Sequence, residues 1–466
     1  MRILLAIVAL LLTLAYTAAA DAVGAADEDI QPDGIQPMEL EEPLIEQPPA
    51  QQTAPSPAMP TFTTPVRVLL SSRASQAQVD CEGAVFVWDA QGRALGKLVP
   101  PVTLVLTGGN VKARDAAGGF TSTALTLAPA DAASLLGFKG REYRGCFRAS
   151  TAVQSGVLLL NVLDMEDYLR GVVPSEMPAM WHPEAVKAQA VAARTYALKE
   201  TLTSRAAQYD VTADTSDQMY LGASKEHPAS DAAIKATEGM VAAYNGQVIT
   251  AYYHSCGGGR TRKGTEPYLA GVESPEESPY NEWKLEYSLS ELSAILAKGG
   301  YSVGKLTGAR TVPAPDERDG FRIEFTGEGG SKQLTTISVR KILGINTCKS
   351  LNFSVETLGD TGEALVALDA SGKLEVRGEI TQGWVKTGSA YAVGAEGVGK
   401  ISGAYALTLD SLPSKVRIIG HGYGHGLGMS QYGAKYMAEH GADWKAIILH
   451  YYTGVQIVNI SELKLP

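Results

Sequence analysis

The stretch from Asp164 to Glu200 constrains the fold more than any other part of the chain, because it predicts two helices joined by a rigid elbow. The first helix is expected to begin at Asp164, a good N-cap residue, and acidic residues in its first turn favour the helix dipole. It is expected to end before Pro174, since proline disrupts a helix interior. The second helix begins at His182 and Pro183 and continues through an alanine-rich segment that strongly favours helix.

The elbow between these helices reads P-S-E-M-P-A-M-W and holds Glu176 near its centre. Pro174 and Pro178 restrict the backbone on both sides of it, and Met177 and Trp181 add apolar bulk. A carboxyl group held among apolar side chains is a candidate general acid, because desolvation favours its neutral form. The alternative is that Glu176 is an ordinary solvated loop residue.

Length and charge limit the classes of protein to consider. A chain of 466 residues is too long for one ordinary domain, so two or three folded units are expected. The net charge is -10 and no long basic run is present, which argues against a nucleic-acid partner. The helices and short strands expected along the chain predict an α+β fold, with mixed helices and antiparallel strands around a catalytic cleft.

The first 20 residues are typical of a secretory signal peptide. Arg2 supplies a positive start, an apolar run extends from Ile3 to Leu14, and Ala18 to Ala20 offer small residues for cleavage. An uncleaved membrane anchor is the alternative, although the run is short for a full span. We therefore expect a secreted or cell-envelope protein that works outside the cytoplasm. Residues 21–64 are acidic and rich in proline, which predicts a disordered linker.

The rest of the chain divides into four segments. Short strands with glycine turns predict a β-rich N-terminal module over residues 65–161. Residues 162–284 hold the two helices and are expected to form the first part of the catalytic core. Residues 285–414 are interpreted as an insertion that contains β structure, and residues 415–466 complete the core.

The four cysteines are Cys81, Cys146, Cys256 and Cys348. In an exported chain they permit two disulfides with three possible connectivities, and Cys81 with Cys146 is an attractive pair because both fall in the N-terminal module. No C-x-x-C spacing is present, which argues against a zinc ribbon.

The block H-G-Y-G-H-G-L-G-M-S-Q-Y-G-A predicts a strand end, a glycine loop and a helix that starts at Ser430. His421 and His425 are four residues apart, but the glycines between them disfavour a helix and no third ligand is near in the sequence. A metal pair is therefore not favoured. The pattern instead favours a sugar-binding wall, in which Tyr423, His425 and Gln431 offer hydrogen bonds and stacking surface.

His254 ends a predicted strand just before three glycines, which allow a backbone to approach a ligand closely. A histidine that is satisfied within the core is the alternative.

Several blocks carry a resemblance to a known family. They are Y-L-R-G-V-V-P-S-E-M-P with W-H-P-E-A-V-K-A-Q-A-V-A-A-R-T-Y-A-L, then Y-H-S-C-G-G-G-R-T from Tyr253, the glycine block from His421, and H-Y-Y-T-G from His450. In these blocks, which come in family order, the chain resembles the SpoIID/LytB family, named for stage II sporulation protein D. The resemblance covers most of the chain from about Val66 onward.

This resemblance implies a lytic transglycosylase that cuts peptidoglycan between N-acetylmuramic acid and N-acetylglucosamine without adding water, leaving 1,6-anhydro ends. Matched to the family motif, Glu176 takes the catalytic acid/base role, and Arg194 matches a residue implicated in activity. The candidate substrate-binding residues are Arg194, Gln218, Tyr220, His254, Tyr423, His425 and Gln431.

In some relatives the loop before Gln218 supplies cysteine or histidine ligands to zinc. Here it offers Asp214 and Asp217 instead, so no metal or cofactor is expected, and these aspartates are predicted to cap the next turn. Other relatives are described as enhancers of an amidase. The second hypothesis is therefore a non-catalytic cell-wall-binding protein that has an N-acetylmuramoyl-L-alanine amidase as its partner.

Overall fold

The structure is a computed structural model that describes residues 57–152, 156–204, 208–314, 320–360 and 412–463. It also describes the short strands β24 (Leu365–Leu368), β25 (Leu374–Arg377), β26 (Val385–Lys386) and β27 (Ala392–Val393). The predicted signal peptide and most of the predicted linker lie outside the described residues. Among the helices that are described, none combines the length and the apolar character that crossing a membrane requires.

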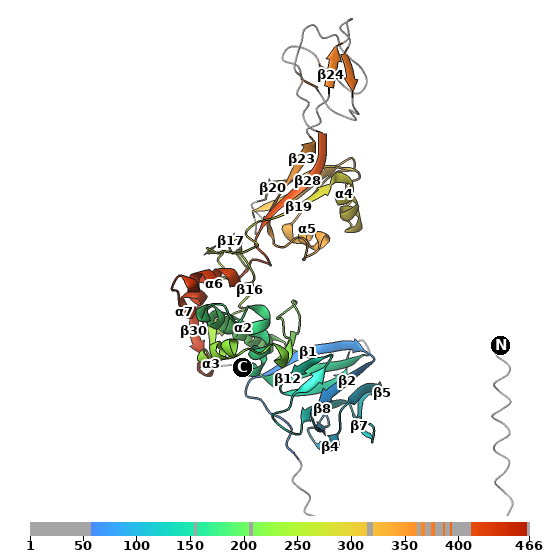
Figure 1. Cartoon of the computed structure of the whole chain (residues 1–466), viewed down its shortest axis with the longest axis vertical. Coiled ribbons are helices and arrows are strands. Elements are labelled where there is room, and N and C mark those ends of the chain that lie inside the picture. Colours follow the sequence, from blue (N-terminus) through green and yellow to red (C-terminus); the bar gives the residue numbers. More distant parts are fainter. Residues whose placement is uncertain are drawn as a thin grey trace, which may run out of the picture. The chain divides into compact units, whose positions relative to one another are not determined.

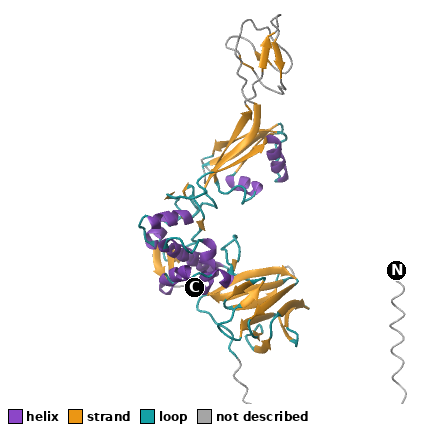
Figure 2. Cartoon of the chain, in the orientation of Figure 1, coloured by secondary structure: helices purple, strands orange, loops and turns teal. Residues whose placement is uncertain are grey.

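The predicted α+β class is confirmed. Seven α-helices and a set of mainly antiparallel sheets occur among the described residues. Figure 2 shows that the strands gather in sheets of their own while most helices group together.

Two antiparallel sheets form the N-terminal module (Figure 1). One comprises, in spatial order, β13 (Val211–Thr212), β1 (Pro65–Ala74), β12 (Val157–Asp164), β11 (Cys146–Thr151), β8 (Ala124–Pro129), β3 (Val85–Trp88) and β4 (Ala94–Leu98). The other comprises β10 (Arg141–Tyr143), β9 (Leu136–Phe138), β2 (Gln76–Cys81), β5 (Val102–Thr107), β6 (Asn110–Arg114) and β7 (Gly119–Ser122). Strand β13 is the exception in direction, since it pairs parallel to β1.

The last residues of the predicted linker contact this module. The indole nitrogen of Trp88 donates to the Pro57 carbonyl at 2.9 Å, and the Thr63 amide donates to the Asp164 carboxylate at 2.8 Å. The Asp164 side chain thus binds the incoming chain and makes no side-chain hydrogen bond to the helix that follows it.

Helix α1 (Met165–Glu176) is longer than the sequence predicts. It does not end before Pro174 but includes this residue, and the Met177 amide closes it on the Val173 carbonyl at 3.0 Å. A proline removes one intrahelical hydrogen bond and crowds the carbonyl four residues earlier. Pro174 lies in the last turn of α1, where only Ser175 and Glu176 follow it, so the cost is confined to the end of the helix. The consequence is that Glu176 is the last residue of a helix and not a loop residue.

Helix α2 (Pro183–Thr203) begins as predicted, with Pro183 in the first turn and the His182 ring accepting from the Glu184 amide. Its alanines are buried on nearly every side, so neighbouring elements can approach closely. It contacts α1, α3 (Pro228–Ala236), α6 (Gln431–Glu439), α7 (Trp444–Tyr451) and β14 (Met240–Tyr244) (Figure 1). Helix α2 is therefore the centre of the helical part.

Short strands complete this part. An Asn-Gly hairpin joins β14 and β15 (Gln247–Val248), with Asn245 and Gly246 both at positive φ. Strand β30 (Gln456–Asn459) also pairs with β14. Strand β16 (Tyr253–His254) pairs in parallel with β29 (Met429–Ser430), and β17 (Gly259–Arg260) pairs with β18 (Glu273–Ser274). Short 3-10 turns lie at Gly222–Lys225 and Ile460–Glu462.

The region interpreted as an insertion has its own hydrophobic core. Strand β28 (Leu412–His421) lies between β19 (Trp283–Ser288) and β23 (Asn352–Asp360), and a second sheet is formed by β20 (Leu306–Pro313), β21 (Phe321–Gly327) and β22 (Gly330–Leu334). Helices α4 (Leu289–Lys298) and α5 (Thr336–Leu343) belong to the same unit. Strand β28 leads directly into the glycine loop, so this unit is joined to the candidate site.

The predicted Cys81–Cys146 disulfide is wrong, because all four cysteines are free thiols. Cys81 lies on β2 and Cys146 on β11, which belong to different sheets. Cys146 packs with Trp88 and Ala128 in a small cluster of its own.

Candidate active site

Glu176 lies at the C-terminal end of α1, where its carboxylate meets residues from three distant segments. The Met219 amide donates to Oε1 at 2.6 Å, and the side chains of Tyr253 and Gln431 lie close enough to lower the pKa of the carboxyl group by hydrogen bonding. Tyr253 belongs to β16 and Gln431 is the first residue of α6. The fold therefore brings the end of α1 to the glycine-rich blocks that lie far away in the sequence.

Burial is the largest influence on the acidity of Glu176. Removal from water raises the pKa of the carboxyl above the ordinary glutamate value, and the hydrogen bonds from Met219, Tyr253 and Gln431 oppose that rise. None of these three donors carries a positive charge, and together they do not cancel the rise in the pKa of Glu176 that burial causes. The group can hold a proton at a higher pH than a solvated glutamate, which a general acid requires.

Gln218 reaches Glu176 through Tyr253. Its amide nitrogen donates to the Tyr253 hydroxyl at 2.9 Å, and its carbonyl oxygen accepts from the Tyr168 hydroxyl at 3.0 Å. Gln218 is fully buried and also donates to the Ala193 carbonyl at 3.3 Å. It therefore positions the Tyr253 hydroxyl and is not placed to touch a substrate.

Tyr253 is not among the residues predicted from the sequence. The predicted residue is its neighbour His254, yet adjacent residues of a strand point to opposite faces. The run Y-Y-H-S-C nevertheless indicates Tyr253 as a second candidate, because a polar group beside a buried carboxyl could come from either face of this short strand.

His254 and His425 face each other on the other side of β16, with ring centroids 5.6 Å apart. His254 Nδ1 lies 3.0 Å from the Leu427 carbonyl oxygen, and His425 Nδ1 accepts from the Leu427 amide at 3.1 Å. Burial lowers the pKa of His254 to about 3 and that of His425 to about 4. Both rings are therefore neutral near pH 7 and hold the glycine loop together.

No three His, Cys, Asp or Glu side chains gather into a possible metal site within the described residues. Asp214 and Asp217 form a local turn, as predicted. Asp214 accepts from the Ser216 amide at 2.9 Å, and Asp217 accepts from the Thr212 amide at 2.8 Å.

Two further candidates lie in the protein interior. Arg194 is fully buried and pairs with both oxygens of Glu166, each at 2.7 Å, and it also donates to the Met240 and Ile234 carbonyls. Tyr220 is buried and donates to Asn161 Oδ1 at 2.7 Å. Arg194 was expected nearer to the substrate, but its bidentate partner is a carboxylate in the first turn of α1. The structure does not bring either side chain to the Glu176 group.

The glycine loop, residues 422–428, is bound to the S-C-G-G-G segment by backbone contacts. The Cys256 amide donates to the Tyr423 carbonyl at 3.0 Å, and the Tyr423 amide donates back at 2.8 Å. Glu276 accepts from the Gly257 and Gly259 amides and from the Ser430 hydroxyl. This carboxylate thereby joins the S-C-G-G-G segment to the start of α6.

We expect Gly428→Ala to destabilise the protein more than Gly246→Ala. Both glycines have positive φ, which alone costs about 1–3 kcal/mol for another residue. A Cβ at Gly428 would also collide with the Tyr252 carbonyl oxygen, whereas Gly246 has open space around it. Urea unfolding of both variants measures the difference. Equal losses of stability would show that the loop yields and that close packing at Gly428 is unimportant.

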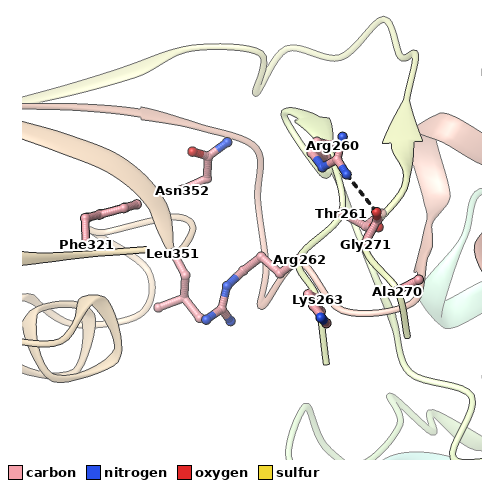
Figure 3. Close-up of a pocket in the computed structure, with 9 residues that line it drawn as sticks. All are labelled: Arg260, Thr261, Arg262, Lys263, Ala270, Gly271, Phe321, Leu351 and Asn352. Atoms are coloured by element: carbon pink, nitrogen blue, oxygen red, sulfur yellow. Dashed lines mark hydrogen bonds between the residues drawn. The ribbon is translucent and has the colours of Figure 1, made fainter. Parts of the chain in front are cut away.

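A separate basic pocket of about 340 Å³ lies beyond the glycine loop (Figure 3). Arg260, Arg262 and Lys263 line it on one side, and Arg262 donates to the His425 carbonyl at 3.1 Å. Phe321, Leu351 and Asn352 line it on the other side. None of its lining residues is among the contacts of Glu176 described above.

The chain is similar to a known protein family and to several individual proteins. A family profile described as stage II sporulation protein (SpoIID) matches residues 153–244, which include Glu176, Arg194 and Gln218. An uncharacterized protein of Brachyspira hyodysenteriae is 29% identical over 319 residues, which are 66% of this chain and 70% of that protein. Stage II sporulation protein D of Bacillus subtilis is 27% identical over 321 residues, 63% of this chain and 74% of that protein.

The amidase enhancer of Bacillus subtilis is 31% identical over 307 residues, which cover 62% of this chain but only 40% of the enhancer. These aligned lengths far exceed the segment that the profile matches, so the relationship extends well beyond the two helices that hold Glu176. Residues 153–244 thus match the SpoIID family model, and the chain is similar over 62–63% of its length to two proteins named stage II sporulation protein D and to an amidase enhancer.

Proposed function

We propose that the protein is a peptidoglycan lytic transglycosylase with Glu176 as its only acid and base. The observation that supports this most strongly is a carboxyl group with a raised pKa whose hydrogen-bond donors, Met219, Tyr253 and Gln431, are all neutral. A neutral carboxyl can donate a proton to a leaving oxygen, and after donation the same donors stabilise the carboxylate.

The proposed reaction needs no water molecule as reactant. Protonated Glu176 gives its proton to the oxygen that joins N-acetylmuramic acid to N-acetylglucosamine, and the bond from that oxygen to the anomeric carbon breaks. The 6-hydroxyl of the muramyl sugar then attacks the anomeric carbon, and the Glu176 carboxylate takes the hydroxyl proton. The products are a 1,6-anhydro end and a free N-acetylglucosamine end, and Glu176 is protonated again.

A single carboxyl suits this chemistry better than hydrolysis. Most glycoside hydrolases use two carboxyl groups, because one must activate water or form a covalent intermediate. In the intramolecular reaction the nucleophile is already held beside the anomeric carbon, so one group can act in both steps.

The alternative is a non-catalytic enhancer of an N-acetylmuramoyl-L-alanine amidase. One observation favours it, which is the similarity to the Bacillus subtilis amidase enhancer over 62% of this chain. In that case the site would bind the cell wall without cutting it. Under either proposal the protein works outside the cytoplasm, where peptidoglycan lies, and the signal-like N-terminal sequence supports this location.

Mass spectrometry of the products separates these proposals. Purified protein incubated with isolated glycan strands, with and without stem peptides, is expected to release muropeptides or sugars that carry anhydromuramyl ends. Hydrated reducing ends would identify a hydrolase instead. No cleavage, together with faster cleavage by an added amidase, would support the enhancer.

Replacement of Tyr253 by phenylalanine is expected to move the activity to higher pH. The Tyr253 hydroxyl lowers the pKa of Glu176, so its loss raises that pKa further and keeps the acid form up to a higher pH. The alkaline limb of the pH–rate profile should therefore shift upward. Tyr451→Phe is the matched control, because that buried hydroxyl contacts Ser274 instead. An unshifted limb in Tyr253→Phe would contradict the role of Glu176 as the titrating acid.

A further inference from the structure

Four aromatic rings form a row, and the first of them, Trp181, lies on the elbow that follows Glu176 in the chain. Trp181 contacts Tyr432 edge to face, with ring centroids 4.9 Å apart. Tyr432 contacts Tyr280 at 6.2 Å, and Tyr280 stacks on Tyr423 at 4.8 Å. The rings come from the elbow after α1, the first turn of α6, the segment before β19, and the glycine loop. We name these four residues the aromatic row.

None of the four residues of the aromatic row is buried. Each is partly exposed, and the neighbouring Met180 is 78% exposed. Aromatic rings that served only to join loops would gain most from full burial. A row that stays open to solvent offers apolar surface to a ligand.

The backbone holds the row in place. The Tyr432 amide donates to the Ser255 carbonyl at 3.0 Å, and the Gly422 amide donates to the Tyr280 carbonyl at 2.8 Å. Tyr423 is fixed by its paired hydrogen bonds with Cys256. Binding would therefore cost little ordering of the rings, because the platform is formed in advance.

The row is also connected to the candidate acid through neighbouring residues of the chain. Gln431, which hydrogen-bonds to Glu176, immediately precedes Tyr432 on α6, and Trp181 lies on the elbow that follows Glu176. Lys435 and Lys349 lie over Trp181 and Tyr280 at 6.0 and 5.4 Å. Such cation–ring contacts are weak at exposed sites, so a ligand can replace them.

We propose that the aromatic row is the platform on which several consecutive sugar rings of one glycan strand stack, leading the strand to Glu176. β-Linked pyranoses present flat C–H faces that pack on aromatic rings. The planes of Trp181 and Tyr432 are inclined by 61° and those of Tyr432 and Tyr280 by 83°, so the open ring faces point in different directions and a twisted strand can contact them one after another. This inference deepens the proposed function and rests on it for the identity of the strand.

Binding of β-1,4-linked N-acetylglucosamine oligomers of two to six sugars tests the platform without requiring cleavage. Isothermal titration with the full chain in the Glu176→Gln background is expected to show affinity that rises with oligomer length. Tyr432→Ala and Trp181→Ala should each weaken binding of the longest oligomer by about tenfold, whereas Tyr432→Phe keeps it within about threefold of the parent. Tyr436→Ala is the matched control on the same helix, since that ring stacks on His440.

A second readout does not depend on how well the alanine variants fold. Oligomers should change the tryptophan fluorescence of the parent protein, and Trp181→Phe should abolish most of that change. The inference is overturned if the alanine variants bind like Tyr436→Ala, or if Trp181→Phe leaves the fluorescence change intact. Binding to the row without anhydro products would refute the proposed function alone, while anhydro products with unaltered binding by the row variants would refute the platform alone.

Discussion

Glu176→Gln is expected to lower the release of anhydromuramyl products by on the order of 10²–10⁴-fold. Glutamine can still accept from the Met219 amide, so the shape of the site is kept, but it has no proton to give to the leaving oxygen. The rate of anhydro-product formation from purified glycan strands, followed by mass spectrometry, measures the effect.

The loss of activity should occur without loss of stability. Because the folded-state pKa of Glu176 is raised, its contribution to stability is complete below the ordinary glutamate pKa and is lost as pH rises through the folded value. Glutamine carries no charge to desolvate, so at pH 7 the variant should unfold at the same temperature as the parent or higher. A lower melting temperature would assign the lost activity to misfolding.

Glu200→Gln is the matched control for this experiment. The pKa of Glu200 on α2 is also raised, chiefly by burial, yet Glu200 does not touch the Met219, Tyr253 and Gln431 group. We expect it to retain parental activity. Equal losses in both variants would mean that a buried charge near α2, and not the acid at the end of α1, governs the rate.

Arg194→Met is expected to lower the free energy of unfolding by about 3–5 kcal/mol, the cost of breaking a buried ion pair by removing one partner. The Arg194 side chain is 0% exposed and Glu166 is 30% exposed, so water can compensate only the carboxylate. The Met240 and Ile234 carbonyls also lose a donor. Urea unfolding at pH 7 measures the change.

Two variants make this prediction specific. Lys187→Met on the same helix removes a part-exposed pair with Glu184 and should cost about 0.3–0.5 kcal/mol. Arg194→Lys keeps the charge but loses the two-pronged contact with Glu166, so an intermediate loss is expected. If Arg194→Met is fully stable but binds glycans poorly, the role at the substrate that the family resemblance implies would be right and the structural role wrong.

Placement of Arg194 is where sequence reasoning and structure differ most. The motif A-A-R-T-Y shows an arginine on a buried helix, but it cannot show which carboxylate lies beside it. Glu166 lies 28 residues earlier in the chain and reaches Arg194 only because α1 packs on α2. Tyr253 is a similar case, since its hydroxyl meets Glu176 across elements that are far apart in sequence.

Features that arise from local backbone chemistry can be predicted from the residues alone. Pro183 after His182 sets the start of α2, Ser430 caps α6, and Asn245 with Gly246 makes the hairpin turn. Caps and turns are made by residues within a few positions of one another, so their energies can be judged without the fold. The α+β class follows from the same local patterns.

The end of α1, the free thiols and the neighbours of Glu176 depend on contacts between distant segments of the chain. Packing let α1 continue through Pro174, placed Cys81 and Cys146 on separate sheets, and surrounded the Glu176 carboxyl with Met219, Tyr253 and Gln431. The physical reason is that desolvation and hydrogen bonding depend on which distant segments meet in space. A residue's type and its immediate neighbours in the chain do not contain that information.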